Sequence, residues 1–449
     1  MENKLTSGSV LKTVVGFSLP FMLSYLLQTL YGLADLFIIG QFNSVEGTTA
    51  VSVGSQVMHM ITVMIVGLAM GTTVLIGRAV GANNRRQAAK YIGNTITLFT
   101  IISFAVTALL LLLVQFIVSA VATPAEAVDG TVMYLTICFI GIPFITAYNI
   151  ISSIFRGLGD SRSPMYFVAV ACVANIALDY LFIGFFDMGA AGAALGTTLS
   201  QTLSVIISLI FIIKKDVGIK LKISDLKPSG ELFGGLLKIG IPIALQDGFV
   251  QVAFLVITAI ANSRGLNDAA AVGIVEKLIG ILFIIPSSML STVSALAAQN
   301  IGADKHDRAR LVLRYAIVIV VCWGTIATIV MELAAEPFVG IFTDNSEVIV
   351  MGGQYMHGYV FDCILAGIHF CFSGYFCAYG RAEISFIHNI CSITLARIPL
   401  AYLASKMFPD TLLPMGIATA TGSAVSCLIC LGVYIYMTHK RQKAITAKR

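Results

Sequence analysis

The chain has 449 residues, of which 57% are hydrophobic and only 11% are charged, and its formal net charge is +5. Soluble globular domains carry about 25% charged residues, because these residues cover the surface that faces water. The composition therefore excludes a soluble globular protein, and a mean hydropathy of +0.91 indicates a chain that crosses a lipid bilayer.

Twelve apolar segments separated by polar breaks follow one another along the chain, each long enough to span a bilayer as a helix. They are residues 12–41, 48–77, 92–120, 129–155, 163–186, 190–213, 232–262, 269–298, 311–335, 349–379, 384–405 and 412–438. Helices are expected because open sheet edges are not stable in hydrocarbon, and because barrel strands would show strict alternation instead. The sequence thus predicts an all-α integral membrane protein with twelve transmembrane helices.

The basic residues predict an orientation. Most of the 28 Lys and Arg residues lie in alternate polar breaks and near the two ends, whereas the opposite breaks hold only Arg264 and Lys406. Because Lys and Arg favour the cytoplasmic side, both termini are expected to be cytoplasmic. The positive net charge then reflects topology and contact with anionic membrane lipids, not binding of nucleic acid.

No motif for enzyme or metal chemistry accompanies these segments. All nine cysteines fall in apolar segments, which favours buried thiols over disulfides. The G-x-x-x-x-G-K-[ST] spacing of a phosphate-binding loop is absent from the sequence. We expect a protein that is not an enzyme, with no cofactor or metal, whose active movement of a solute would use an ion gradient.

The two halves of the chain resemble each other. "GRAVGANNRRQA" aligns with "AQNIGADKHDRA" at an offset of 221, and Pro20 aligns with Pro242 at an offset of 222. Six spans per half give repeats of the same orientation, and transporters built in this way bind substrate between their halves. The sequence predicts two pseudo-symmetric six-helix lobes around a central cavity. Its expected parts are an N-terminal lobe at 1–213, a cytoplasmic linker at 214–231, a C-terminal lobe at 232–438 and a basic cytoplasmic tail at 439–449.

Five acidic residues lie well inside predicted spans. An ionised acid at the middle of a bilayer costs roughly 2.5–3.5 kcal/mol. Apolar replacements would remove this cost, so each acid is a candidate functional residue. They are Asp35, Asp179, Asp247, Glu276 and Asp362.

Asp35 and Asp179 form the first candidate site, because both are predicted at a similar depth in the N-terminal half. A carboxyl group held away from water favours its protonated form, and a second carboxylate nearby adds to this preference. The pair could therefore take up and release protons. The alternative is that each acid only bonds a neighbouring helix as part of the packing. Polar side chains expected to support the pair are Tyr31, Asn175, Tyr180 and Gln201.

Asp247, Glu276 and Asp362 form a second, looser set in the C-terminal half. They could make a carboxylate cage for sodium or an acidic wall for a cationic substrate. A structural ion pair with Lys277 or Arg397 is the alternative.

Several motifs resemble those of the multidrug and toxic compound extrusion (MATE) family. They include Pro20 followed fifteen residues later by Asp35 and "LFIIG", "RGLGDSRSP" after the fourth span, and "NIALD" in the fifth span. The resemblance implies two six-helix lobes that form a V-shaped cavity and export organic cations in exchange for protons or sodium.

Residue by residue, the resemblance implies that Asp35 and Asp179 are proton-linked aspartates, and that helix one bends at Pro20 as they are protonated. Tyr180 stands where many members have proline, which implies a milder bend. The acids of the sodium-coupled branch fall in another register from Asp247 and Asp362, which disfavours sodium coupling through them.

We therefore expect a secondary active transporter that exports amphipathic organic cations by antiport with protons, or with sodium, through alternating access. It would work as a monomer in the plasma or inner membrane, among membrane lipids. The alternative is a flippase for a lipid-linked precursor or polysaccharide carrier. Such a flippase would need cationic side chains in its cavity for a phosphate group, whereas acids outnumber bases inside the predicted spans.

Overall fold

The computed structural model describes residues 5–214 and 218–446. These residues form α-helices with short 3-10 and π-helical turns, and they contain no strand. The predicted all-α fold class is therefore confirmed. Residues 215–217 of the predicted linker and 447–449 of the predicted tail lie outside the described residues.

The first six spans agree closely with the predicted apolar segments. A π-helical turn, η2, continues α5, and two 3-10 turns precede α4 and α7. The elements are α1 (Val10–Phe42), α2 (Val45–Gly81), α3 (Arg85–Ala120), η1 (Ala125–Ala127), α4 (Val128–Leu158), α5 (Arg162–Asp179), η2 (Tyr180–Phe185), α6 (Gly189–Lys214) and η3 (Ile223–Leu226).

The second half contains more interrupted helices. α8 and α9 are bent by 40° at their junction, as are α11 and α12, so twelve spans result when each bent pair counts as one. The elements are α7 (Gly230–Asn262), α8 (Leu266–Leu282), α9 (Ile284–Gly302), α10 (His306–Gly340), α11 (Ser346–Tyr359), α12 (Asp362–Ala378), α13 (Ala382–Ser392), the π-helical turn η4 (Ile393–Arg397), α14 (Ile398–Met407) and α15 (Leu413–Thr446).

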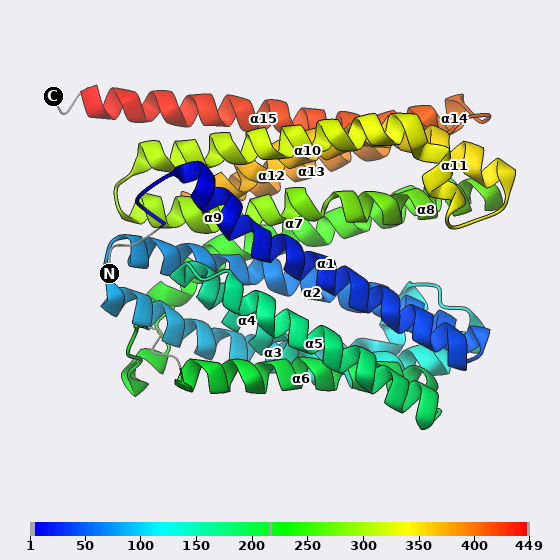
Figure 1. Cartoon of the computed structure of the whole chain (residues 1–449), viewed down its shortest axis with the longest axis horizontal. Coiled ribbons are helices and arrows are strands. Elements are labelled where there is room, and N and C mark those ends of the chain that lie inside the picture. Colours follow the sequence, from blue (N-terminus) through cyan, green and yellow to red (C-terminus); the bar gives the residue numbers. More distant parts are fainter. Residues whose placement is uncertain (1–4, 215–217, 447–449) are drawn as a thin grey trace. The chain divides into compact units, whose positions relative to one another are not determined.

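The described chain divides into two compact units (Figure 1). Unit 1 comprises residues 1–244 and 298–306, and unit 2 comprises residues 245–297 and 307–449. Unit 1 thus includes the first part of α7 and the end of α9. The lobe boundaries predicted from the sequence, at 213 and 232, stay a prediction.

Unit 1 is built around α4, which packs against α2, α3 and α6, while α5 packs between α1 and α6. The connection from α4 to α5 shows how the sequence ends one helix and begins the next. Gly159 adopts a left-handed φ of 93°, a conformation that glycine adopts without steric cost. The Asp160 carboxylate then accepts hydrogen bonds from the backbone N–H groups of Arg162 and Ser163, both at 3.0 Å.

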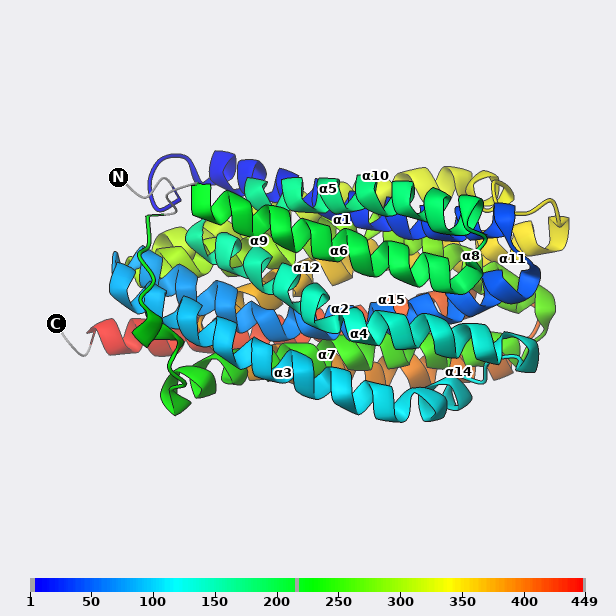
Figure 2. The ribbon, with the colours of Figure 1, turned by 90° about the horizontal axis from the view of Figure 1, so that it is seen from below.

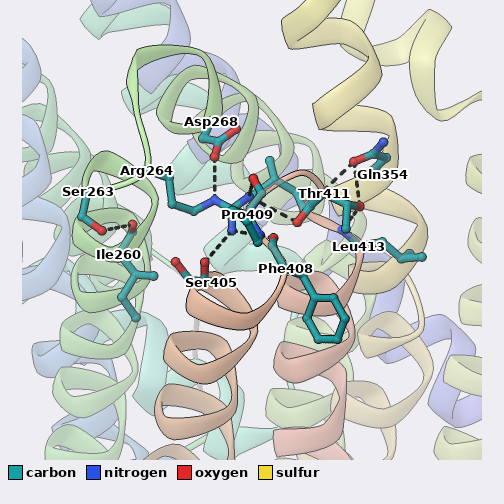
Figure 3. A network of polar contacts seen from close by, with 11 residues as sticks. Ile260, Ser263, Arg264, Asp268, Gln354, Ser405, Phe408, Pro409, Thr411 and Leu413 are labelled. Atoms are coloured by element: carbon teal, nitrogen blue, oxygen red, sulfur yellow. Dashed lines mark hydrogen bonds and ion pairs between the residues drawn. The ribbon is translucent and has the colours of Figure 1, made fainter.

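In unit 2, α15 lies along α11, α12 and α14. A polar network joins the α7–α8 connection to the α14–α15 connection (Figure 3). The Arg264 guanidinium donates to the Asp268 carboxylate and to four backbone carbonyl groups. The side chain of Arg264 is only 6% exposed, so this network fixes one end of unit 2 from within.

Candidate ion-coupling site

The two aspartates of the first predicted site lie together in unit 1. Asp35 comes from α1 and Asp179 is the last residue of α5, two helices that pack against each other. Asp35 is 5% exposed and Asp179 is fully buried. Their carboxyl groups interact with each other, and Asn175, one helical turn before Asp179, lies beside Asp35.

Few donors meet these carboxyl groups. The Thr197 hydroxyl donates to Asp35 Oδ2 over 3.4 Å. Among the described residues, Asp35 Oδ1 and both carboxylate oxygens of Asp179 have no hydrogen-bond partner. Because buried polar atoms are nearly always satisfied, the arrangement fits a bound proton or cation between the two carboxyl groups.

Local sequence explains why Asp179 lies so close to α6. Gly196 of α6 faces the Asp179 carboxylate, and a Cβ atom at this position would overlap Asp179 Oδ1. The absent side chain lets the acid enter the helix interface. Directly after Asp179 the backbone changes to the π-helical turn η2, and such turns are frequent at functional sites.

The predicted supporting residues have different places. Tyr31 lies one turn before Asp35 and interacts with it electrostatically. Gln201 is 9% exposed and follows Thr197 by one turn of α6, on the same side of the helix. Tyr180, however, is 45% exposed and packs against Phe42, with ring centroids 6.1 Å apart, so the structure does not bring it to the pair.

Pro20 is buried inside α1, fifteen residues before Asp35. Its ring removes a backbone donor from the helix, and the Ser24 hydroxyl donates to the Pro20 carbonyl oxygen over 2.8 Å. α1 runs without interruption through this position. The proline is therefore a locally weakened point between the start of α1 and Asp35.

The second predicted set does not form one cage. Arg397 Nη2 lies 3.3 Å from Asp362 Oδ2 and donates to the Tyr359 hydroxyl over 2.9 Å. Glu276 also feels the charge of Arg397 and accepts a bond from Thr258. The ion pair that the sequence left open is thus made with Arg397.

The remaining members of that set lie apart from it. Asp247 has Gln246 as its polar neighbour, with 3.5 Å between Gln246 Nε2 and Asp247 Oδ1. Lys277 is exposed and takes no part in the Arg397 group. No group of three or more His, Cys, Asp or Glu side chains suited to a metal ion occurs in the described residues.

Sequence reasoning missed a small pocket in unit 1, with a volume of about 40 Å³ and both polar and apolar side chains in its lining. Tyr25, Gln28, Asn149, Ser152 and Arg156 contribute to its lining. The Arg156 guanidinium stacks over the Phe21 ring, with 5.8 Å between Arg156 Cζ and the ring centroid. Among the described residues, no carboxylate pairs with Arg156. Arg156 lies beside a polar break that is rich in basic residues. From the sequence, an arginine at such a position indicates only the orientation of the chain in the membrane.

Comparison with known proteins explains this architecture. The sequence model of the MatE family matches residues 20–181 and again residues 242–403. The chain belongs to the MatE family. The two matches begin at Pro20 and Pro242, so they also confirm the internal repeat, at the same offset of 222 residues.

Relatives of this MatE chain include named transport and resistance proteins. "Probable multidrug resistance protein YpnP" of Bacillus subtilis (strain 168) is 29% identical over 98% of this chain and 97% of its own length. The "FAD transporter" of Shewanella oneidensis is 26% identical over 92% of this chain and 94% of its own length. A solved structure, "Crystal structure of MATE in complex with MaL6", has a TM-score of 0.91 at 22% identity, covering 98% of this chain and 99% of the other.

These matches establish a multi-pass membrane transporter of the MatE family. The structural likeness confirms the fold, and the family match confirms the resemblance that the motifs around Asp35 and Asp179 indicate. The roles of the individual site residues stay predictions.

Proposed function

We propose that this MatE transporter exports organic cations in exchange for protons, with Asp35 and Asp179 as the coupling site. The observation that carries the proposal is the burial of two adjacent carboxyl groups with no cation paired to either among the described residues. A relative named as a probable multidrug resistance protein, at 29% identity over nearly the whole chain, supports export of drugs.

The charge of the pair would be the switch. With both groups ionised, two negative charges lie side by side in a buried place, which is unfavourable without a counter-ion. One proton would provide the donor that the carboxylate oxygens lack and would leave a single charge. The two protonation states thus favour different packing of α1 against α5.

Alternating access would follow from that difference. Pro20 weakens the backbone hydrogen bonding of α1, so the segment between Pro20 and Asp35 is the one that would repack when the pair is protonated. Repacking would displace the substrate, and deprotonation at the other side of the membrane would restore the first state. The shift in the equilibrium is limited by the difference in proton affinity between the two states.

Two gradients applied separately test the proposal. Purified full-length protein in liposomes would be loaded with a fluorescent organic cation, and a pH gradient and a sodium gradient would be imposed in turn. We expect the native protein and the control Asp129→Asn, which changes an exposed acid at the start of α4, to move dye with the pH gradient. Asp35→Asn should lose this movement. Movement driven only by sodium would assign sodium to the site, and unchanged movement in Asp35→Asn would refute coupling there.

The same liposomes measure the stoichiometry. Each pH unit is worth about 1.36 kcal/mol, so exchange of one proton for one monovalent cation holds a tenfold dye gradient per pH unit, independent of voltage. Exchange of two protons adds about 2.3 kcal/mol for each 100 mV. A dye gradient that changes when the voltage is clamped at constant pH would indicate the second stoichiometry.

Arg156 favours one second candidate, export of an anionic amphiphile such as a lipid-linked precursor. A guanidinium that lines a pocket and has no paired carboxylate suits a phosphate or carboxylate group. A relative named as an FAD transporter supports an anionic cargo. Under this candidate, an anionic dye would move in preference to a cationic dye, and Arg156→Gln would abolish that movement while Asp129→Asn would not.

We further propose that the protein works as a monomer in the plasma or inner membrane with both termini in the cytoplasm. The distribution of Lys and Arg residues supports this orientation. Labelling of single cysteines introduced at exposed Asp187 and Lys440 with a membrane-impermeant reagent, in a cysteine-free background, would test it. Reaction of the Asp187 position alone in intact cells is expected, and reaction of the Lys440 position alone would reverse the orientation.

A further inference from the structure

Unit 1 contains an apolar cavity of about 330 Å³, separate from the aspartate pair. Its walls come from α3, α4 and α6 and from the segment that follows α6. At roughly 30 Å³ for each water molecule, the cavity has room for about ten. The hydroxyl groups of Thr100 and Ser103 in its wall donate to carbonyl groups of their own helix, so they leave little to bind water. Such a cavity favours an apolar occupant.

The cavity reaches an exposed surface of unit 1. Ile96 of α3 and Leu209 of α6 contribute to its lining, and these side chains are 39% and 48% exposed. In a transmembrane unit this exposure faces hydrocarbon, because these helices are apolar along most of their length. An acyl chain of the bilayer can therefore reach the cavity from its side.

A short strap closes one end of the cavity. In residues 218–222 the side chains alternate, with Ile219 and Leu221 lining the cavity and Lys220 exposed between them. Arg85 of α3 donates to the Gly218 carbonyl oxygen over 3.1 Å. Figure 2 shows this part of the chain beside the start of α3, and η3, which follows the strap, packs on that helix. The strap is thus a fixed wall with an apolar inner side and a basic outer side.

Basic residues are close in sequence to the residues that line this end of the cavity. Arg86 is neutralised by Asp225, with 2.6 Å between Arg86 Nη2 and Asp225 Oδ1. The exposed side chains of Lys90, Lys214 and Lys220 form no ion pair within the part of the chain that the structure describes. The charge beside the apolar cavity is therefore positive and available to an anion.

We propose that this cavity binds one acyl chain of an anionic glycerophospholipid, with the lipid phosphate held by the lysines at the strap. Both halves of the ligand are matched: the apolar cavity takes the chain, and the basic rim takes the headgroup. This inference does not depend on which ion or substrate is transported.

Native mass spectrometry of the full-length protein would test the site. The protein would be equilibrated with phosphatidylglycerol and phosphatidylcholine of identical acyl chains, and the retained lipids would be counted. We expect phosphatidylglycerol to be retained in preference. Lys220→Ala should lower that preference about fivefold, the change that about 1 kcal/mol for each basic residue near an anionic headgroup gives. Lys440→Ala, on α15 in unit 2, is the matched charge control.

A second variant tests the cavity itself. Ala147→Trp would fill it, because Ala147 lines it, and should lower retention of both lipids. Leu112→Trp on α3, where the side chain is 83% exposed, adds the same bulk outside the cavity and should leave retention unchanged. Equal retention of the two lipids by the native protein, or equal effects of the two tryptophans, would overturn the proposal.

Photolabelling keeps the test decisive if Ala147→Trp does not fold. A phosphatidylglycerol that carries a diazirine in its acyl chain would be irradiated with the native protein. Labels are expected on peptides that contain Phe99, Ile150 or Leu209. Labelling spread evenly over the apolar helices would contradict an acyl-chain site.

Discussion

Arg264→Ala should strongly destabilise unit 2, because this side chain connects two loops from a buried position (Figure 3). Arg264 Nε lies 2.5 Å from Asp268 Oδ2, and the two side chains are 6% and 7% exposed. The guanidinium also donates to the carbonyl oxygens of Ser405, Phe408 and Pro409 at 3.0, 3.1 and 2.8 Å. Removing one partner of a buried ion pair costs about 3–5 kcal/mol, mostly because the other charge is left without compensation.

This loss of unfolding free energy corresponds to a shift in the melting temperature. For a unit of 150–250 residues, 1 kcal/mol shifts the midpoint by about 2–4 °C, so Arg264→Ala should lower it by roughly 6–20 °C. The assay is fluorescence-detected size exclusion of the detergent-solubilised protein after heating. Arg264→Lys keeps the charge opposite Asp268 but loses the planar fork that reaches several carbonyl groups, so it should melt between the native protein and Arg264→Ala.

A double variant separates the charge from the remaining bonds. Arg264→Ala with Asp268→Asn removes the uncompensated carboxylate, and it should recover part of the loss. A melting temperature of Arg264→Ala within 1–2 °C of the native value would refute the reasoning. A double variant no more stable than Arg264→Ala would instead show that the carbonyl contacts, and not the buried charge, dominate.

Three further predictions concern other parts of the molecule. Gly196→Ala should displace the Asp179 carboxylate, because a Cβ atom would overlap it, and should abolish proton-driven dye transport in liposomes. Gly273→Ala, on α8 where the space is open, should transport normally. The backbone N–H of Lys222, directly before η3, and the Arg86 guanidinium of α3 hold the pKa of Asp225 below its usual value. Asp225 therefore stabilises the fold above the unfolded pKa of about 3.9, and it loses this contribution as the pH falls further. Relative to the intrinsic rate at the same pH, hydrogen exchange in residues 218–229 should therefore accelerate below about pH 4 in the native protein but not in Asp225→Asn. Parallel acceleration in both would contradict this. Arg397→Met should lower the midpoint by several degrees, since it leaves the buried carboxylate of α12 without the partner now 3.3 Å away, at a cost of about 3–5 kcal/mol; an unchanged midpoint would show that this carboxylate is not ionised.

The sequence alone determined the class of fold and its repeat. Twelve apolar segments were visible because a membrane span must be apolar over about 20 consecutive residues, and this is a local property of the chain. The repeat was visible because Pro20 and Pro242 keep their spacing relative to their neighbours, and the family matches begin at these same two residues. Asp35 and Asp179 were identifiable as candidates because a buried acid is costly wherever its helix lies.

Only the tertiary structure decided which of these residues meet. It placed Asp179 beside Asp35, kept Tyr180 away from them, and assigned Asp362 to Arg397 instead of to a cage with Asp247. A helix that is apolar on every side carries no strong moment that fixes which side faces a neighbour. The rotation of each helix is set by close packing with its neighbours, as at Gly196, where the absence of one side chain lets a carboxylate enter the interface. The spans and their acids are thus local properties of the sequence, whereas the site depends on contacts between helices that are distant in sequence.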